Sequence, residues 1–247
     1  SEVKEITDEL NLDIHKTTIE EPFNWERVTK LYNQTKMLRP HDWWIVSDDD
    51  ELQVYNERKH LGKILGIEDI IEECEDRGNT YVCGAFLDRI GEGGKFPRIT
   101  HDSNIWKEFP LAGSFRVHTS QACPNKICLM KGYVEVTNGQ HYVKINGKDT
   151  YGDRWKHRQR YDDRNCFVQV NHFKWDLSVI TRLKEVVDIK KSYTYHEEYK
   201  RMFDYILDNN MRIDISDERF MIERCGKHYG DYLQWEKVKA QSKAYRI

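Results

Sequence analysis

The chain has 247 residues, of which 38% are hydrophobic and 33% charged, and its formal net charge is −3. This length and apolar content allow one large α/β domain with a sizeable core, which we favour over two small domains, and nothing in the composition indicates disorder. The near balance of charge argues against nucleic acid as a partner, and no apolar run approaches the ~20 residues of a transmembrane helix.

Apolar spacing predicts, in chain order, a helix at residues 1–10, a strand at 12–18, a helix at 24–37, a strand at 43–47, a helix at 64–77 capped by Gly78, and a strand at 81–88. Residues 97–110 are expected to be irregular. Further on, we expect strands at 126–136 and 141–145 around the turn Asn138-Gly139, a charged loop at 151–164, a strand at 166–170, and helices at 179–187 and 195–209. The alternation of strands and helices is typical of an α/β fold.

Six cysteines are scattered along the chain without a CxxC pair or a regular framework. They indicate reduced thiols in a cytoplasmic protein, with peripheral attachment to a membrane as an open alternative. Cys123 and Cys128 could instead form a disulfide or part of a soft-metal site, although no second ligand pair at finger spacing accompanies them.

Four consecutive acids, Asp48 to Glu51, directly follow the apolar strand predicted at residues 43–47. Asp48 and Asp50 can point the same way, because alternate residues of a strand share a face. Two carboxylates at the end of a strand suit Mg²⁺ or Mn²⁺ that carries a diphosphate. The alternative is a polar turn whose acids are simply solvated.

Two other polar residues are expected at the ends of predicted strands, where ligands collect in open α/β sheets. His172 could complete a metal site with the acids, and an imidazole ligand would favour Mn²⁺ over Mg²⁺. It could equally be a hydrogen-bonded structural residue. Asp88 could be a general base or could hold a ligand, or it could form a salt bridge with Arg89 or Arg98 that fixes the next loop.

Two residues in the second half of the chain could contact a phosphorylated ligand. Lys126 could neutralise phosphate groups, although basic side chains are usually solvated. His141 could bond a sugar hydroxyl or a phosphate oxygen, or it could cap the hairpin at Asn138-Gly139.

An ordered set of segments resembles the GT-A glycosyltransferases, in particular the family-two-like group with a short aspartate motif followed by Glu. The segments are DWWIVSDDDE at 42–51, GAFLDRIGEGG at 84–94, EFPL at 108–111, NKICLMKG at 125–132, NGQH at 138–141 and NHFKWD at 171–176. The resemblance departs from the family at the third acid, Asp49, where a small residue is more usual.

The resemblance implies a glycosyltransferase that depends on Mn²⁺ or Mg²⁺ and inverts the anomeric centre. It implies metal ligands at Asp48, Asp50 and His172, and catalytic roles for Asp88 as the base and for Glu51, which would orient the motif or meet the sugar. Donor contacts would come from Arg27, Asn33, Asp48, Lys126 and His141.

The resemblance also implies a GT-A-like (Rossmann-like) mixed sheet flanked by helices in residues 1–190, with a C-terminal helical extension at 191–247 packed on it. The first strand and helix of that fold are expected to be missing. The implied partners are a UDP- or GDP-sugar and a glycan or glycoconjugate acceptor. The alternatives are an inactive carbohydrate- or nucleotide-binding module and a metal-dependent phosphoesterase or nuclease.

Overall fold

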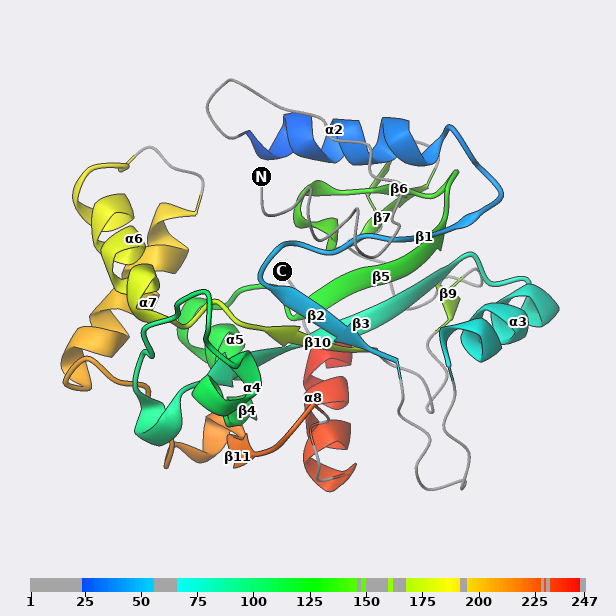
Figure 1. The fold of residues 1–247 in the computed structure, drawn as a ribbon. Coiled ribbons are helices and arrows are strands. Elements are labelled where there is room, and N and C mark those ends of the chain that lie inside the picture. Colours follow the sequence, from blue (N-terminus) through cyan, green and yellow to red (C-terminus); the bar gives the residue numbers. More distant parts are fainter. Residues whose placement is uncertain are drawn as a thin grey trace.

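The computed structural model describes residues 24–55, 66–145, 148–149, 160–161, 168–191, 195–227, 229 and 232–244. Within them the protein is a mixed α/β fold, in which a curled mixed sheet is flanked by helices (Figure 1). The elements predicted at residues 1–10 and 12–18, and most of the loop at 151–164, lie outside the described residues.

The central sheet has the strand order β1 (Trp43–Ile45), β5 (Asn125–Lys131), β3 (Tyr81–Ile90), β10 (Val168–His172) and β2 (Glu51–Val54). Strands β3 and β10 are parallel, and β5 is antiparallel to both β1 and β3. Strands β1, β3 and β10 therefore run in the same direction, so their carboxyl ends lie at one edge of the sheet.

Shorter strands extend this sheet and form a second one. Strand β4 (Leu111–Gly113) pairs with β3 and with β11 (Glu223–Arg224), and β9 (Arg160–Tyr161) is parallel to β3. The small second sheet consists of β6 (Glu135–Val136), β7 (Val143–Ile145) and β8 (Lys148–Asp149). Strands β6 and β7 are antiparallel and enclose the 3₁₀ turn η3 (Asn138–Gln140), which confirms the hairpin predicted at Asn138-Gly139.

The predicted helices are confirmed as α2 (Trp25–Lys36), α3 (Ile67–Arg77), α6 (Leu177–Asp188) and α7 (His196–Asp208). Asn24 caps α2 by accepting a hydrogen bond from the Arg27 amide, and Gly78 caps α3 in the left-handed conformation that was expected. The remaining helical elements are η2 (Glu92–Gly94), α4 (Ile105–Glu108), α5 (Phe115–Ser120), η4 (Glu218–Phe220) and α8 (Tyr232–Ala244). The prediction that residues 97–110 are irregular missed the short α4.

Strand β3 is the centre of the core, because all ten of its residues are buried. Its alternate side chains point to opposite faces of the sheet. Val82 and Phe86 pack with α3, whereas Tyr81 and Leu87 belong to the cluster that includes α8. Helices α6 and α7 pack against each other around a third cluster at the edge of the sheet (Figure 1).

Several predicted strand boundaries were wrong: β3 continues to Ile90, two residues beyond the prediction, β7 begins only at Val143, and the other differences concern β5, β1 and β10. The strand predicted at 126–136 stops at Lys131 because the chain turns at Gly132, where a Cβ atom would lie 2.4 Å from the Arg39 carbonyl oxygen. Strand β1 ends at Ile45, whose side chain is 53% exposed, so it is not the buried strand that was expected. Strand β10 continues to His172 rather than ending at residue 170.

No helix among the described residues is long and apolar enough to cross a membrane. Cys74, Cys83, Cys123, Cys128 and Cys225 are not joined in disulfides, and Cys166 lies outside the described residues.

Candidate functional site

The acid run, Asp88 and His172 come together at the carboxyl edge of the sheet. In the strand register, His172 of β10 lies opposite Asp88 of β3 on one side and opposite Glu51 of β2 on the other. The acid run forms the turn between β1 and β2, closed by a hydrogen bond of 3.2 Å from the Glu51 amide to the Asp48 carbonyl. This is the meeting point that the strand ends predicted.

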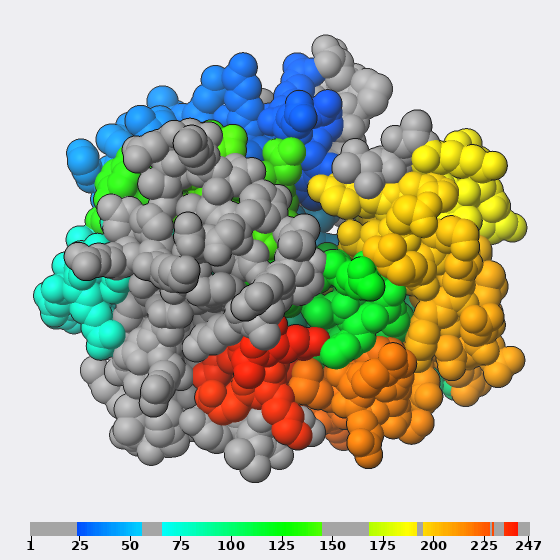
Figure 2. Space-filling model, turned by 180° about the vertical axis from the view of Figure 1, so that it is seen from behind, coloured from blue at the N-terminus to red at the C-terminus, as the bar shows by residue number. Residues whose placement is uncertain are grey.

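A cavity of about 1010 Å³ opens at this edge. Helix α2 contributes an aromatic and apolar wall of Trp25, Val28 and Tyr32, and α6 and α7 contribute Arg182 and Glu198 from another side. In Figure 2 the blue residues of α2 and the yellow residues of α6 lie on different sides of a hollow. The acid run thus faces a space large enough for a ligand of several rings.

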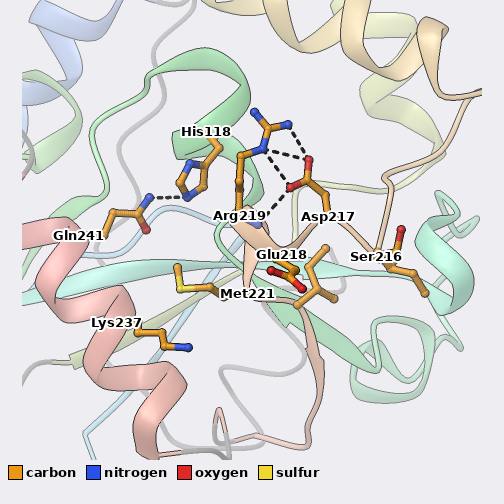
Figure 3. A pocket seen from close by; sticks show the side chains of 10 residues that line it. His118, Ser216, Asp217, Glu218, Arg219, Met221, Lys237 and Gln241 are labelled. Carbon is orange, nitrogen blue, oxygen red and sulfur yellow. Dashed lines mark hydrogen bonds and ion pairs between the residues drawn. The ribbon is translucent and has the colours of Figure 1, made fainter.

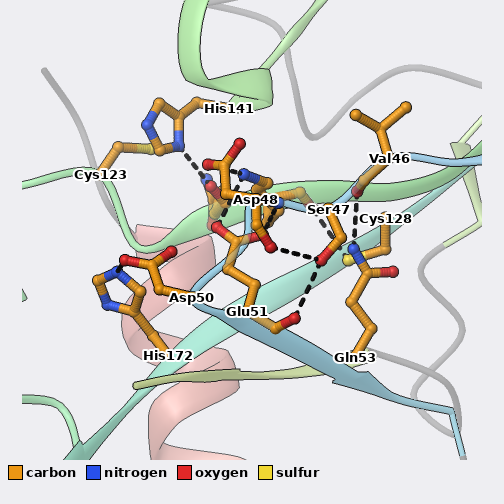
Figure 4. Close-up of polar contacts among 12 residues, drawn as sticks. Val46, Ser47, Asp48, Asp50, Glu51, Gln53, Cys123, Cys128, His141 and His172 are labelled. Carbon is orange, nitrogen blue, oxygen red and sulfur yellow. Dashed lines mark hydrogen bonds and ion pairs between the residues drawn. The ribbon is translucent and has the colours of Figure 1, made fainter. Parts of the chain in front are cut away.

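Asp50, His172 and Asp88 form a line of polar contacts from the cavity into the core. His172 Nε2 lies 3.3 Å from Asp50 Oδ2, and His172 Nδ1 lies 3.3 Å from Asp88 Oδ1 (the first contact is drawn in Figure 4). Burial alone would lower the pKa of His172, but the two carboxylates raise it above its ordinary value. Burial works to raise the pKa of Asp50, yet His172 holds it well below its usual range.

Asp88 is placed to orient His172 rather than to meet a substrate. It is 1% exposed, and its oxygens also accept hydrogen bonds from Trp175 Nε1 at 2.9 Å and the Arg116 amide at 2.7 Å. Burial favours a higher pKa for Asp88, but its bond to His172 and the charges of His172 and Arg116 lower it. A carboxylate this buried, with three hydrogen-bond donors and outside the lining of the cavity, is poorly placed for the general-base role expected of Asp88.

The other half of the acid run is tied to Lys126. The Lys126 ammonium lies 2.8 Å from Glu51 Oε1 and 2.9 Å from Asp48 Oδ2, and the Lys126 side chain is 1% exposed. Glu51 Oε2 also accepts a hydrogen bond of 3.3 Å from the Asp48 amide. Glu51 is therefore linked to the turn of the acid run, and the Lys126 ammonium lies between two carboxylates of the run. The roles expected for Glu51 and Lys126 stay predictions.

The charges of this trio respond to burial and to one another. Burial works against the charged form of Lys126, but Glu51 and Asp48 together raise the pKa of Lys126 above its ordinary value. Burial raises the pKa of Glu51, Asp48 adds to the rise, and Lys126 opposes it. The raised pKa of Lys126 and the raised pKa of Glu51 have one geometric explanation. A single buried ammonium lies between two carboxylates, so it is held in its charged form, while the two carboxylates still repel each other.

The metal set expected at Asp48, Asp50 and His172 forms only in part. Asp50 and His172 are adjacent, whereas Asp48 contacts Lys126. No group of three or more His, Cys, Asp or Glu side chains in the described part of the chain could hold a metal ion. The pair Asp50 and His172 still fits Mn²⁺ if phosphate oxygens and water complete the coordination, because a carboxylate on the second ring nitrogen is the usual support of a metal-binding histidine.

His141 lines the cavity as a neutral ring. Its Nδ1 lies 2.7 Å from the Asn125 carbonyl oxygen, which can only accept, so Nδ1 carries the hydrogen and Nε2 keeps its lone pair. Burial, followed by the charge of Arg116, lowers the pKa of His141 to about 3. His141 can therefore accept a hydrogen bond from a ligand hydroxyl, one of the roles expected for it, but it cannot pair with a phosphate as a cation.

Arg27 and Asn33, from which donor contacts were expected, lie on α2 outside the lining of the cavity. The Asn33 side chain donates to the Val136 carbonyl and accepts from the Val136 amide, both at 3.0 Å, so it fixes α2 to β6. Arg27 is exposed and does not line the cavity, which α2 reaches through Trp25 and Tyr32 instead.

Sequence reasoning missed a basic part of the cavity, formed by Arg116, Lys174 and Arg182. The Arg116 guanidinium lies 4.5 Å from the centre of the Phe86 ring, and Lys174 and Arg182 lie 5.1 and 5.8 Å from the ring of Tyr199. Burial, together with the charges of Arg116 and Arg182, lowers the pKa of Lys174 to about 8. The one signal in the sequence was the position of Lys174 two residues after His172.

A second cavity of about 700 Å³ lies between α5, η4 and α8 (Figure 3). Asp217 and Arg219 in its wall bind each other, with 2.6 Å between Arg219 Nη2 and Asp217 Oδ2. His118 and Gln241 are likewise in contact. Because these polar groups satisfy one another, the cavity at the acid run is the stronger candidate site.

Comparison of the chain with models of protein families, with curated proteins and with solved structures gave no match.

Proposed function

We propose that the chain is a metal-dependent glycosyltransferase with a GT-A-like sheet, which moves a sugar from a UDP- or GDP-sugar to a hydroxyl of a glycan or glycoconjugate. The observation that carries the proposal is the line Asp50–His172–Asp88, which ends in a large cavity at the carboxyl edge of the sheet. A carboxylate and an oriented imidazole suit a cation that carries a diphosphate, and the aromatic wall of α2 suits a nucleoside.

Each residue of the site then has a distinct task. Asp50 and His172 would hold Mn²⁺ or Mg²⁺, which when bound supplies Lewis-acid stabilisation of the leaving nucleoside diphosphate. Asp88 keeps the ring of His172 in position, and Lys126 with Glu51 fixes the turn that carries Asp50. Neutral His141 would accept a hydrogen bond from a hydroxyl of the donor.

The general base should be a carboxylate that lines the cavity outside the acid run. Among the described residues Glu198 of α7 meets this condition, whereas Asp88 is buried below His172. We assign to Glu198 the removal of the proton from the attacking acceptor hydroxyl. A single displacement of this kind inverts the configuration of the transferred sugar.

Calorimetry and thermal shift with UDP, GDP and their sugars, with and without Mn²⁺, test the proposal. We expect Mn²⁺-dependent binding of one nucleotide that is lost in Asp50→Ala. Asp49→Asn is the matched control, since Asp49 is an exposed acid of the same run. Equal loss in both variants would refute the ligand assignment. Absence of nucleotide binding in the wild type would refute the proposed function, and release of phosphate without sugar transfer would select a phosphoesterase.

A further inference from the structure

The basic cluster of Arg116, Lys174 and Arg182 has no role in the metal, donor and base assignments of the proposed glycosyltransferase. The three residues come from α5, from the segment between β10 and α6, and from α6, and all line the cavity of the acid run. None of them forms an ion pair with a carboxylate of the described chain, in contrast to Lys126. The charges of Arg116 and Arg182 act against that of Lys174, and Asp50 and Glu198 offset them only in part, so a bound anion would stabilise the cluster.

The donor groups of the cluster are only partly used. Arg116 donates from Nη2 to the Cys123 carbonyl at 3.0 Å, while its Nε is buried without a hydrogen-bond partner. The hydrogen bond of Lys174 is a long one, 3.5 Å to the Tyr199 hydroxyl. Arg182 contacts the face of the same ring. Tyr199 is 5% exposed and fixed in the α6–α7 core, so it holds two cations at the cavity wall with donors to spare.

The position of the cluster relates it to the second substrate. Helix α2, with its aromatic wall, and the α6–α7 pair lie on different sides of the acid run (Figure 1). If the nucleoside lies along α2 and its diphosphate at Asp50 and His172, the α6–α7 side is where the acceptor enters. Glu198, assigned as the base, lines this same side.

We propose that Arg116, Lys174 and Arg182 bind an oxyanion, a phosphate or a carboxylate, carried by the acceptor. This inference rests on the proposed function. The anion would anchor the acceptor beside Glu198, so that the reacting hydroxyl is oriented while the cations gain a direct ion-pair partner, which no carboxylate of the described residues supplies. Guanidinium and ammonium groups are the usual ligands of such oxyanions.

Inorganic phosphate is the probe, and its binding to the full chain is measured by calorimetry at low ionic strength. We expect Arg182→Met and Lys174→Met each to weaken phosphate binding about tenfold, the usual loss for one charge-assisted hydrogen bond. Lys200→Met is the matched control, because Lys200 lies next to Tyr199 on α7 but is exposed and pairs with Asp204. Because Arg182 is exposed, Arg182→Met should fold normally, and its loss of phosphate binding can then be read without an effect on stability.

A second titration decides which substrate carries the anion. If the acceptor does, phosphate binds with unchanged affinity when the site is saturated with the nucleoside diphosphate and Mn²⁺, and Arg182→Met leaves nucleotide affinity within twofold of the wild type. Competition between phosphate and nucleotide would overturn the proposal and assign the cations to the donor diphosphate. Absence of phosphate binding to the wild type would also overturn it.

Failure of the proposed function gives a different pattern. If no nucleotide binds the wild type but phosphate binding is lost in Arg182→Met, the cluster is an anion site of another kind. That result would reject the acceptor assignment together with the glycosyltransferase, whereas competition would reject the acceptor assignment alone.

Discussion

The trio of Lys126, Glu51 and Asp48, of which Lys126 and Glu51 are buried, gives a prediction that can be tested without any ligand. In Lys126→Met, Glu51 loses a partner at 2.8 Å while its side chain is only 2% exposed. Asp48 loses a partner at 2.9 Å but is 24% exposed, so water replaces part of that contact. We therefore expect the Glu51 contact to dominate, with a loss of about 3–5 kcal/mol in the free energy of unfolding.

Thermal melting followed by circular dichroism measures this loss. For a chain of this size, 3 kcal/mol corresponds to a fall in Tm of about 6–12 °C. Lys131→Met is the matched control on the same strand, because Lys131 pairs with Glu75, whose side chain is 53% exposed. A surface pair of that kind contributes about 1 kcal/mol or less.

A double-mutant cycle makes the prediction more specific. Glu51→Gln should cost about 1–2 kcal/mol, because its amide oxygen can still accept from Lys126. The double variant Lys126→Met, Glu51→Gln should be more stable than the sum of the single losses implies, by about 2 kcal/mol, since no uncompensated charge remains at Glu51. Additive losses, or a Lys126→Met variant as stable as Lys131→Met, would refute the trio.

Three further predictions concern the rest of the site and the core. Asp88→Asn should lower Mn²⁺ affinity 10–100-fold, because the ring of His172 loses the carboxylate that orients it. Calorimetry measures this affinity, and an unchanged value would contradict the prediction. Glu198→Gln should abolish sugar transfer and leave nucleotide binding unchanged. Sugar transfer by this variant would show that another residue is the general base. Burial lowers the pKa of Lys36 to about 8. Between pH 8 and the ordinary pKa of lysine, Lys36 is therefore protonated in the unfolded chain but not in the folded one, so the free energy of unfolding should rise with pH in this range. Lys36→Met should lack this rise when unfolding is measured as a function of pH. The same pH dependence in the variant and the wild type would disprove the assignment to Lys36.

Elements with strong local signals were predictable from the sequence. Helices α2 and α3 have apolar residues at helical spacing and recognisable caps at Asn24 and Gly78. Helix α5 is six residues long, too short for a period to emerge. The break at Gly132 depends on the backbone of residues 36–39, which approaches from elsewhere in the fold, and no local pattern encodes it.

The site was predictable as a location but not as a set of contacts. The positions of Asp50 and His172 at strand ends follow from local sequence, and the two residues do meet. The partners of Lys126 lie 75 and 78 residues away in the chain. Which of several nearby acids a cation contacts depends on side-chain direction within the assembled sheet, and hydrophobic periodicity does not carry that information.

The contacts explain how four adjacent acids are tolerated and why they are not equivalent. Lys126 compensates Asp48 and Glu51 below the turn, and His172 compensates Asp50 at the cavity, while Asp49 is exposed. A metal ion that replaced the Nε2 proton of His172 would bind Asp50 as well, and the contacts of Lys126 with Asp48 and Glu51 would stay intact. A cation held by Asp48 and Asp50 together would first have to draw Asp48 away from Lys126. The first route disturbs fewer buried contacts, and so Asp50→Ala should affect metal binding much more than Asp48→Asn.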